Sequence, residues 1–200
     1  MQTTLQIAGV LLAIITIWLD TRENIWARPL SLVGTSMALF VYYPAGLYAK
    51  CLLNGCYIVL NVYGWHKWLY GGEEKTTLQV SKTPAKILIL ATALGLVAAA
   101  ALGRLFAFYS KASLPYWDSL HTIFSLMAQW MLMHKKLESW ILWIGLDVLY
   151  PIVCYHQALY LFSGLKLAYI VLAIQGYRSW HQSYQQHLAA PTGSSDGSLG

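Results

Sequence analysis

Two stretches of the chain decide the fold, because they match without a gap at a spacing of 112 residues: YYPAGLYAKCLLNGCYIVLNVYGWHKW at 42–68 and CYHQALYLFSGLKLAYIVLAIQGYRSW at 154–180. Ten positions are identical between Tyr43 and Trp68, and they include tyrosine, glycine and tryptophan. Apolar helices resemble one another because their compositions are similar. Similar composition alone does not align tyrosine, glycine and tryptophan at the same positions without a gap. We interpret the match as an internal duplication.

The composition predicts that the duplicated units lie in a lipid bilayer. Of the 200 residues, 58% are hydrophobic and 10% are charged, which is far from soluble usage. The apolar residues form blocks about as long as a helix needs to cross a roughly 30 Å hydrocarbon core. We therefore expect an all-α membrane protein with seven transmembrane helices, at Leu5–Leu19, Leu30–Tyr43, Leu47–Leu69, Pro84–Phe106, Pro115–Met133, Trp140–Tyr155 and Leu159–Trp180. The second and sixth spans are shorter than the usual minimum of roughly 17 residues, so we expect them to include flanking residues such as Trp26 and Leu137.

The duplication also predicts the domain organisation. The shift connects the third span with the seventh, so each unit has three helices and the fourth helix links them. Because one additional crossing restores orientation, the two units should be parallel, as in several transporters whose sites lie between the repeats near mid-membrane. The predicted divisions are a first three-helix repeat at 1–70, a loop and linking helix at 71–112, a second repeat at 113–181 and a disordered cytoplasmic tail at 182–200.

Positive charges are distributed unevenly between the two sides of these spans. Of the 13 Lys and Arg residues, nine lie on one side and Lys50, Arg104, Lys111 and Lys166 on the other. The positive-inside rule makes the richer side cytoplasmic, so we expect the N-terminus outside and the C-terminus inside. This bias accounts for the net charge of +5 and gives no reason to expect a nucleic-acid partner.

We expect no catalytic group, metal site or cofactor. Cys51, Cys56 and Cys154 lie within apolar spans, and an odd number of cysteines cannot pair completely. No Cys/His pairing has the spacing that zinc sites use, and no Ser or Cys stands in a nucleophile motif. The pattern is therefore not that of an intramembrane enzyme.

Polar side chains within the spans are the candidate substrate-binding residues, because such groups are costly in hydrocarbon and tend to face the bundle interior. One helical face of the fifth span combines Asp118, Thr122, Ser125 and Gln129. A similar stripe in the sixth span combines Trp140, Trp143, Asp147, Tyr150 and Cys154. The duplicated stripe in the third span adds Asn54 and Asn61. Amides also serve as contacts between helices, and Asp118 follows Trp117 at a helix start, where a carboxylate favours the helix dipole. From these stretches we select eight candidate substrate-binding residues: Asn54, Asn61, Trp117, Asp118, Gln129, Trp143, Asp147 and Tyr150.

Asp147 is the sharpest candidate of this set. A carboxylate in the middle of a span, with no basic residue in its own helix, needs a partner, a proton or a cationic ligand. We expect the ligand, because Trp143 and Tyr150 beside a carboxylate suit a flat cationic ring through cation–π attraction.

Five runs of sequence resemble a known family: ENIWARPLSL at 23–32, YGWHKW at 63–68, LPYWDS at 114–119, HKKLESWILWIGLDVLY at 134–150 and QALYLFSGLKLAYIVLAIQGYRSW at 157–180. They are similar to the nicotinamide riboside transporters called PnuC, and the resemblance covers nearly all of residues 5–181. The Trp-Asp-Ser at 117–119 and the Lys-Lys-Leu-Glu-x-Trp-x-x-Trp at 135–143 are its most specific parts.

The resemblance implies a SWEET-like fold of three, one and three helices, a bacterial inner-membrane location and a homotrimer. It also implies uptake of nicotinamide riboside by facilitated diffusion, with trapping by a cytoplasmic kinase. Ser139 and Asp147 depart from the family pattern, and the family includes thiamine transporters, so thiamine is the alternative substrate. A seven-helix retinal pigment is the distant alternative, and it would need Lys166 as its Schiff-base lysine.

Overall fold

The computed structural model describes residues 2–44, 46, 48–72, 76–109, 114–156 and 160–189. Within this part of the chain it contains seven α-helices: α1 (Gln2–Thr21), α2 (Ala27–Tyr42), α3 (Tyr48–Tyr70), α4 (Ala85–Tyr109), α5 (Pro115–Met133), α6 (Glu138–His156) and α7 (Tyr160–Ala189). Each predicted span corresponds to one helix, and α5 has the predicted bounds. The all-α fold is therefore confirmed.

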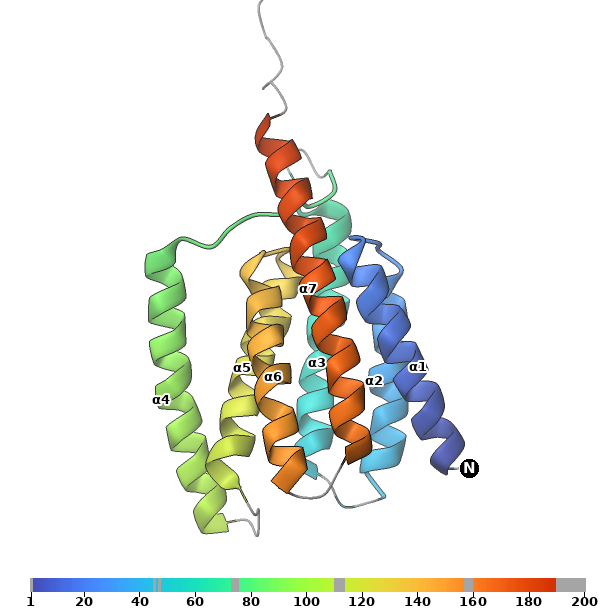
Figure 1. Ribbon diagram of the computed structural model, residues 1–200, viewed down its shortest axis with the longest axis vertical. Coiled ribbons are helices and arrows are strands. Elements are labelled where there is room, and N and C mark those ends of the chain that lie inside the picture. The colour runs from blue at the N-terminus through green and yellow to red at the C-terminus, as the bar shows by residue number, and fades with distance from the viewer. Residues whose placement is uncertain are drawn as a thin grey trace, which may run out of the picture.

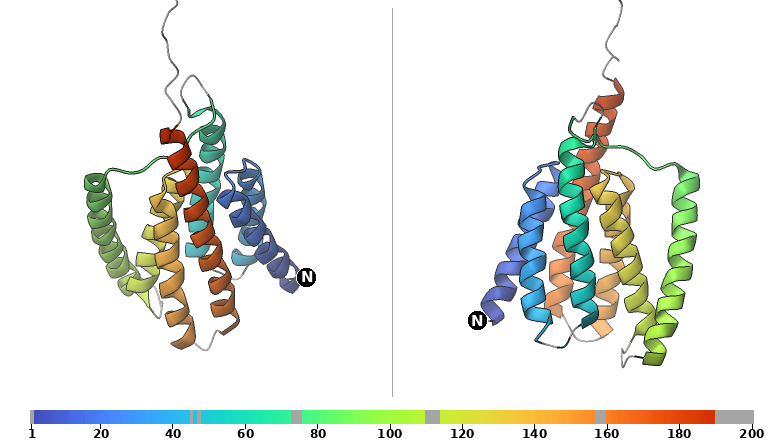
Figure 2. Two further views of the ribbon diagram at one scale, coloured as in Figure 1. Left: turned by 45° about the horizontal axis from the view of Figure 1, so that its top comes forward. Right: turned by 180° about the vertical axis from the view of Figure 1, so that it is seen from behind.

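Six of the helices form a bundle, and α4 stands at its edge against α5 (Figure 1, Figure 2). The bundle contacts pair α1 with α2, α2 with α3, α5 with α6 and α6 with α7, and the two halves meet where α1 contacts α7 and α3 contacts α5. This pairing is unchanged when α1, α2 and α3 are exchanged with α5, α6 and α7. Such symmetry is what two three-helix repeats with a linking helix would produce, and the residue limits of the repeats stay a prediction.

Helix boundaries also follow the spacing of the sequence match. α1 ends at Thr21 and α5 at Met133, while α3 begins at Tyr48 and α7 at Tyr160. Both pairs of positions are 112 residues apart. The register found at 42–68 and 154–180 thus extends to the first helix of each half.

The bounds of the other six helices differ from the predicted ones, and two of these differences bear on the predictions above. The second helix begins at Ala27 rather than Leu30, which gives it 16 residues. The predicted tail from Gln182 is wrong over its first eight residues, because α7 continues to Ala189. Gln, Leu and Ala are good helix formers, and Tyr184 in this segment packs against the core and lies under the ammonium of Lys82. Residues 190–200 lie outside the described part.

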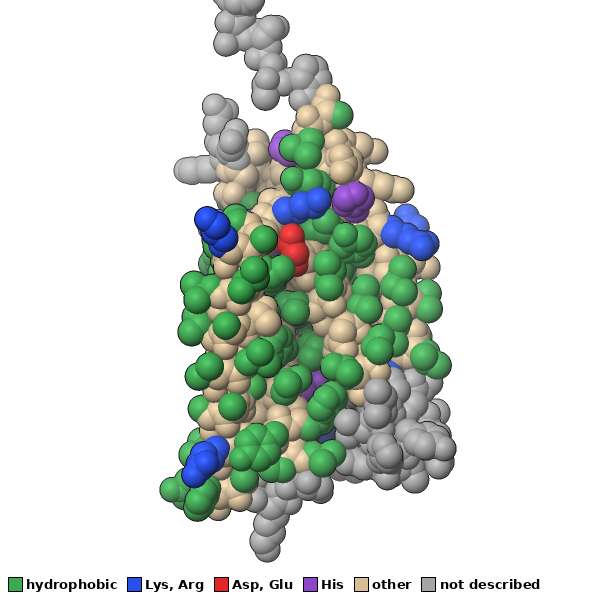
Figure 3. Space-filling model, turned by 60° about the vertical axis from the view of Figure 1, so that its left-hand side comes forward, with side chains coloured by type: hydrophobic (Ala, Val, Ile, Leu, Met, Phe, Trp, Pro, Cys, Tyr) green, Lys and Arg blue, Asp and Glu red, His purple; other side chains and the backbone are tan. Residues whose placement is uncertain are grey.

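Among the described helices, α4 alone is both long and apolar enough to cross a membrane by length and composition. Its outer face presents large exposed side chains such as Ile89, Val97 and Phe108. Figure 3 shows that face covered mainly by hydrophobic side chains, with Lys and Arg gathered toward the two ends. The bundle helices contain more polar residues than α4. Several of these, such as Asn54, Gln129 and Asp147, line the interior of the bundle.

One end of the bundle is closed by tightly packed aromatic side chains; we call it the Asp20 end, where α1 and α5 finish. Trp68, Trp140 and Trp180 are at most 2% exposed, and Trp180 meets the other two rings edge-on at centroid distances of 5.9 and 5.4 Å. The Trp180 indole N–H donates to the backbone oxygen of Asp20, 2.8 Å away. The segment before α4 crosses this end and exchanges backbone hydrogen bonds with the α5–α6 turn through Ser81.

Gly176 lets α7 approach the Trp140 ring, and its replacement should destabilise the bundle. A Cβ at this position would lie 2.6 Å from ring carbons of Trp140, a rigid group enclosed by the other indoles. Overpacking of this kind costs about 1–3 kcal/mol, so we expect Gly176→Ala to lower the unfolding temperature of the purified protein in detergent. Gly145→Ala is the control, because a Cβ there meets nothing within 4 Å. Equal unfolding temperatures for the two variants would contradict this packing.

Candidate functional site

A cavity of about 590 Å³ lies between the two halves of the bundle. Its described lining residues come from all six bundle helices and none from α4. Ligand pockets for small molecules are typically about 300–1,000 Å³ and combine apolar walls with a few polar groups. The cavity therefore has the size and position expected of a substrate site between repeats.

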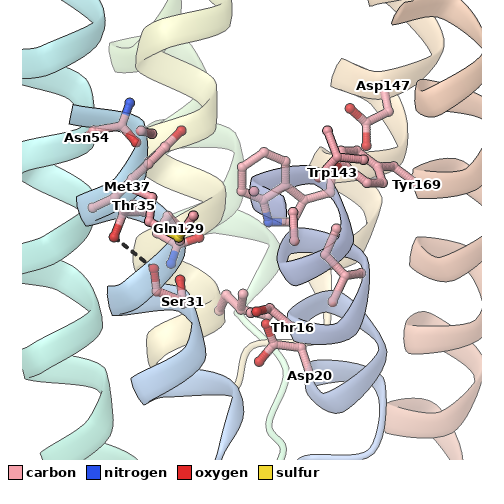
Figure 4. A pocket seen from close by; sticks show the side chains of 18 of the residues that line it. Thr16, Asp20, Ser31, Thr35, Met37, Asn54, Gln129, Trp143, Asp147 and Tyr169 are labelled. Carbon is pink, nitrogen blue, oxygen red and sulfur yellow. Dashed lines mark hydrogen bonds between the residues drawn. The ribbon is translucent and has the colours of Figure 1, made fainter. Parts of the chain in front are cut away.

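The two long walls of the cavity differ in chemistry (Figure 4). Asn54 of α3 and Gln129 of α5 present amides on one wall, and Trp143 and Asp147 of α6 with Tyr169 of α7 stand opposite them. Amides and tyrosine hydroxyls offer both donors and acceptors, whereas the Trp143 indole offers a flat apolar face. The arrangement can hold a flat ring against Trp143 while its polar substituents bond across the cavity.

Asp147 already has a cationic partner in the structure. The Lys166 ammonium of α7 donates to the Asp147 carboxylate, with an Nζ to Oδ1 distance of 2.6 Å. The structure thus adds a basic partner from the neighbouring helix, and a ligand as a partner of this carboxylate stays a prediction. The periodicity within a single helix does not predict this contact between α6 and α7.

A buried ion pair lies where the cavity reaches the Asp20 end. The Arg28 guanidinium, on α2, bonds to the carboxylate of Asp20 on α1, and both side chains are at most 6% exposed. Arg28 also donates to the amide oxygen of Asn61 at 3.1 Å and lies 4.6 Å above the centre of the Trp68 ring. Four side chains thus connect α1, α2 and α3 in a region closed to water.

A second ion pair lies beside the first at this end, and its side chains are 7% exposed for Lys135 and 20% exposed for Glu23. Lys135 donates to Glu23 at 2.8 Å and lies 4.8 Å from the centre of the Trp68 ring, so this indole is placed between two cations. Glu23 and Lys135 have positive φ angles of 53° and 48° in the α1–α2 and α5–α6 turns. The pair therefore joins the corresponding turns of the two halves.

The eight predicted binding residues divide into four groups. Asn54, Gln129, Trp143 and Asp147 line the cavity. Asn61 does not line it but is fully buried behind Gln129, whose amide nitrogen is 3.5 Å from the Asn61 amide oxygen. Trp117 and Asp118 are not among the lining residues, because the first turn of α5 lies near α4, and Asp118 is exposed. The Tyr150 side chain lies outside the described part of the structure.

Several lining residues were missed from the sequence, chiefly Asp20, Tyr57, Lys166 and Tyr169. The repeat held a signal for two of them, since Tyr57 and Tyr169 are identical residues at equivalent positions and both face the cavity. Lys166 is the equivalent of Asn54, which was selected. Asp20 stands next to the end of an apolar span, where a carboxylate would ordinarily be solvated.

Comparisons with known proteins define the class. The crystal structure titled as that of the vitamin B3 transporter PnuC has the same fold, with a TM-score of 0.74 at 19% identity over 92% of this chain and 83% of that chain. The nicotinamide riboside transporter PnuC of Escherichia coli is 22% identical over 91% of this chain and 87% of its own length. The riboflavin/roseoflavin transporter RibM of Streptomyces davaonensis is 25% identical over 86% of this chain and 82% of its own.

These relatives are named as transporters, and the matching family model is also that of a transporter family: this chain is a multi-pass inner-membrane transporter and not an enzyme. The model of the Nicotinamide mononucleotide transporter family matches residues 3–182, and the chain belongs to that family. The predicted family resemblance is confirmed, and it displaces the retinal-pigment alternative.

Loss of one partner of the Arg28–Asp20 pair should destabilise the bundle strongly. Removing one partner of a buried ion pair leaves an uncompensated charge and costs about 3–5 kcal/mol, so Arg28→Met should lower the free energy of unfolding sharply. Replacing both partners, with Asp20→Leu added, should recover part of this loss.

Thermal or denaturant unfolding in detergent would measure both effects. Glu23→Gln is the matched control, because the Glu23 side chain is 20% exposed and its loss should cost less. Unfolding of Arg28→Met at the same point as Glu23→Gln would contradict the assignment of the inner pair as the stronger one.

Proposed function

We propose that this chain takes up nicotinamide riboside by facilitated diffusion across the bacterial inner membrane, with the substrate trapped by a cytoplasmic kinase. The observation that carries the proposal is the Trp143 indole beside the Asp147 carboxylate, facing the Asn54 and Gln129 amides across one cavity. A pyridinium ring gains both stacking and charge neutralisation from the first pair. The ribose hydroxyls find donors and acceptors in the second pair.

Transport also requires that each end of the cavity open in turn. The Asp20 end is filled by Arg28, Met133 and Trp180, none of which is exposed. Opening this end means separating the helices that these side chains join, which is the rocking of one repeat against the other expected of this kind of carrier. No residue in the site supplies a step of bond chemistry, and passage down a gradient needs none.

The homotrimer and the orientation belong to the same proposal. The exposed apolar face of α4 suits lipid or a neighbouring subunit equally in area and chemistry. With the N-terminus outside, the Asp20 end is the cytoplasmic end, and the charged residues Lys67, Lys82, Lys136 and Arg178 lie near it.

Reporter fusions test that orientation. A green fluorescent protein joined after Gly200 should fluoresce, since it folds in the cytoplasm, and alkaline phosphatase at the same position should be inactive because it needs the periplasm. Fusions placed ahead of Met1 should give the opposite result. Active alkaline phosphatase at the C-terminus would reverse the proposed direction of the bundle.

Riboflavin is the second candidate substrate, on a specific observation. The two cavity carboxylates both have cationic partners, so the lining brings no uncompensated negative charge toward a ligand. A neutral flat heterocycle would fit such walls, and the relative RibM is named for riboflavin. Thiamine, which is cationic, remains the third ligand to compare.

Ligand titrations of the purified protein, followed by tryptophan fluorescence, separate these candidates. Nicotinamide riboside should quench the emission, and Trp143→Ala should weaken its binding by about 5- to 150-fold, the equivalent of one stacked base or about 1–3 kcal/mol. Asp147→Asn should weaken it too, by removing the charge that faces the ring. Trp26→Ala is the control, because that indole is 64% exposed outside the cavity.

The outcome of the titrations assigns the substrate. Quenching by riboflavin alone would favour the neutral ring and overturn the nicotinamide riboside proposal, and quenching by thiamine alone would overturn it in favour of the second cation. Equal losses in Trp143→Ala and Trp26→Ala would contradict the stacking role of Trp143.

A further inference from the structure

A cationic substrate that binds to Asp147 would have to break the ion pair between Asp147 and Lys166. Lys166 is the seventh residue of α7, and its ammonium lies 2.6 Å from the Asp147 carboxylate and 5.3 Å from the centre of the Tyr169 ring. The Lys166 side chain is 19% exposed, whereas that of Asp147 is 6% exposed. The ammonium is therefore less deeply buried than the carboxylate that it neutralises.

Two of the described lining residues, Asp20 and Asp147, carry carboxylates, and of these Asp147 has the partner that can leave. Asp20 is bound by Arg28, which is fully buried and also bonded to Asn61 and stacked on Trp68, so it cannot withdraw without disrupting three helices. Lys166 has a flexible four-carbon stem close to the start of its helix, from which an ammonium can reach the interface. A pyridinium ring in the cavity would meet Asp147 by replacing Lys166.

We propose that Lys166 is an exchangeable counter-ion: it neutralises Asp147 when the carrier is empty and yields that carboxylate to the cationic ring when the substrate binds. This inference rests on the proposed function. A facilitated-diffusion carrier must return through the membrane without its substrate, and an unpaired carboxylate in a closed low-dielectric site is costly. Lys166 removes that cost from the empty carrier, while the substrate removes it from the loaded one.

The consequence is a split between two kinds of transport. Net uptake into substrate-free vesicles requires the empty carrier to return, but exchange against substrate inside the vesicles does not. Lys166→Met leaves Asp147 without its partner only in the empty carrier, and it also removes the competitor for the ring. The variant should therefore bind the cation more tightly, lose net uptake and keep exchange.

Purified protein in liposomes, with labelled nicotinamide riboside outside, measures both modes. We expect Lys166→Met to reduce net uptake by about tenfold or more, as an unpaired buried carboxylate costs well over the 1.4 kcal/mol that a factor of ten represents, while exchange stays close to the wild-type rate. Lys166→Arg should retain both modes, because it keeps the charge. Lys82→Met is the control and should keep both modes at the wild-type rate, because Lys82 is not a lining residue and its ammonium lies over the Tyr184 ring, 4.9 Å from the centre.

Each outcome separates the inference from the proposed function. Equal losses of net uptake and exchange in Lys166→Met would mean a structural role, and unchanged rates in both would mean none; either result overturns the counter-ion role while wild-type transport of nicotinamide riboside still supports the function. A wild type that carries thiamine instead overturns the choice of nicotinamide riboside as substrate. Loss of net uptake with retained exchange in Lys166→Met, measured with labelled thiamine, would then support the counter-ion role, and equal rates would contradict it. A wild type that carries only riboflavin overturns both. The unfolding temperature of Lys166→Met in detergent shows whether the variant folds.

Discussion

The packing of the bundle depends on the burial of one charge, the Arg28 guanidinium. A cation that is 0% exposed must be paired and hydrogen-bonded, and Arg28 satisfies this through Asp20, Asn61 and the Trp68 face. These partners come from α1 and α3, on both sides of its own helix. The need to compensate a single charge thus fixes how the three helices of the first half meet at the Asp20 end.

The second half closes the Asp20 end with aromatic side chains instead of a buried charge. Trp140 lies 112 positions after Arg28 and packs edge-on against Trp180, as Arg28 packs over Trp68. Trp68 and Trp180 are themselves equivalent and meet each other across the halves. One half therefore closes this end with a cation on an indole and the other with an indole on an indole, so only the first half needs a carboxylate there.

Much of this architecture could be predicted from the sequence because it depends on local chemistry. Apolar blocks gave the number of helices, and the register of Tyr, Gly and Trp gave the relation between α3 and α7. The cavity residues Gln129 and Asp147 were found because each is costly in lipid unless it faces inward, and Trp143 was found because it shares a helical face with Asp147. Asp118 was expected there because it shares the helical face of Gln129, and Trp117 directly precedes it, but α5 is long enough for its first turn to leave the cavity and meet α4.

What the sequence could not provide were the partners across helices. Asp147 has no cation within its own helix, yet Lys166 reaches it from α7, and Asp20 meets Arg28 only because the α1–α2 turn folds back. Such pairs depend on rotation and depth in the bundle, which periodicity within one helix does not specify.

The positions where the two halves diverge suggest how a symmetric fold acquires an asymmetric site. Asn54 and Lys166 occupy equivalent places, and so do Asn61 and Ala173, while Tyr57 and Tyr169 remain identical. The amide of the first half bonds within its own helix, from Asn54 to the Lys50 backbone oxygen, whereas the ammonium of the second half reaches Asp147. The difference between Asn54 and Lys166 therefore gives one wall a hydrogen-bonding amide and the other wall a movable charge. A carrier that binds a ring with distinct polar and aromatic sides requires such a difference between its two walls.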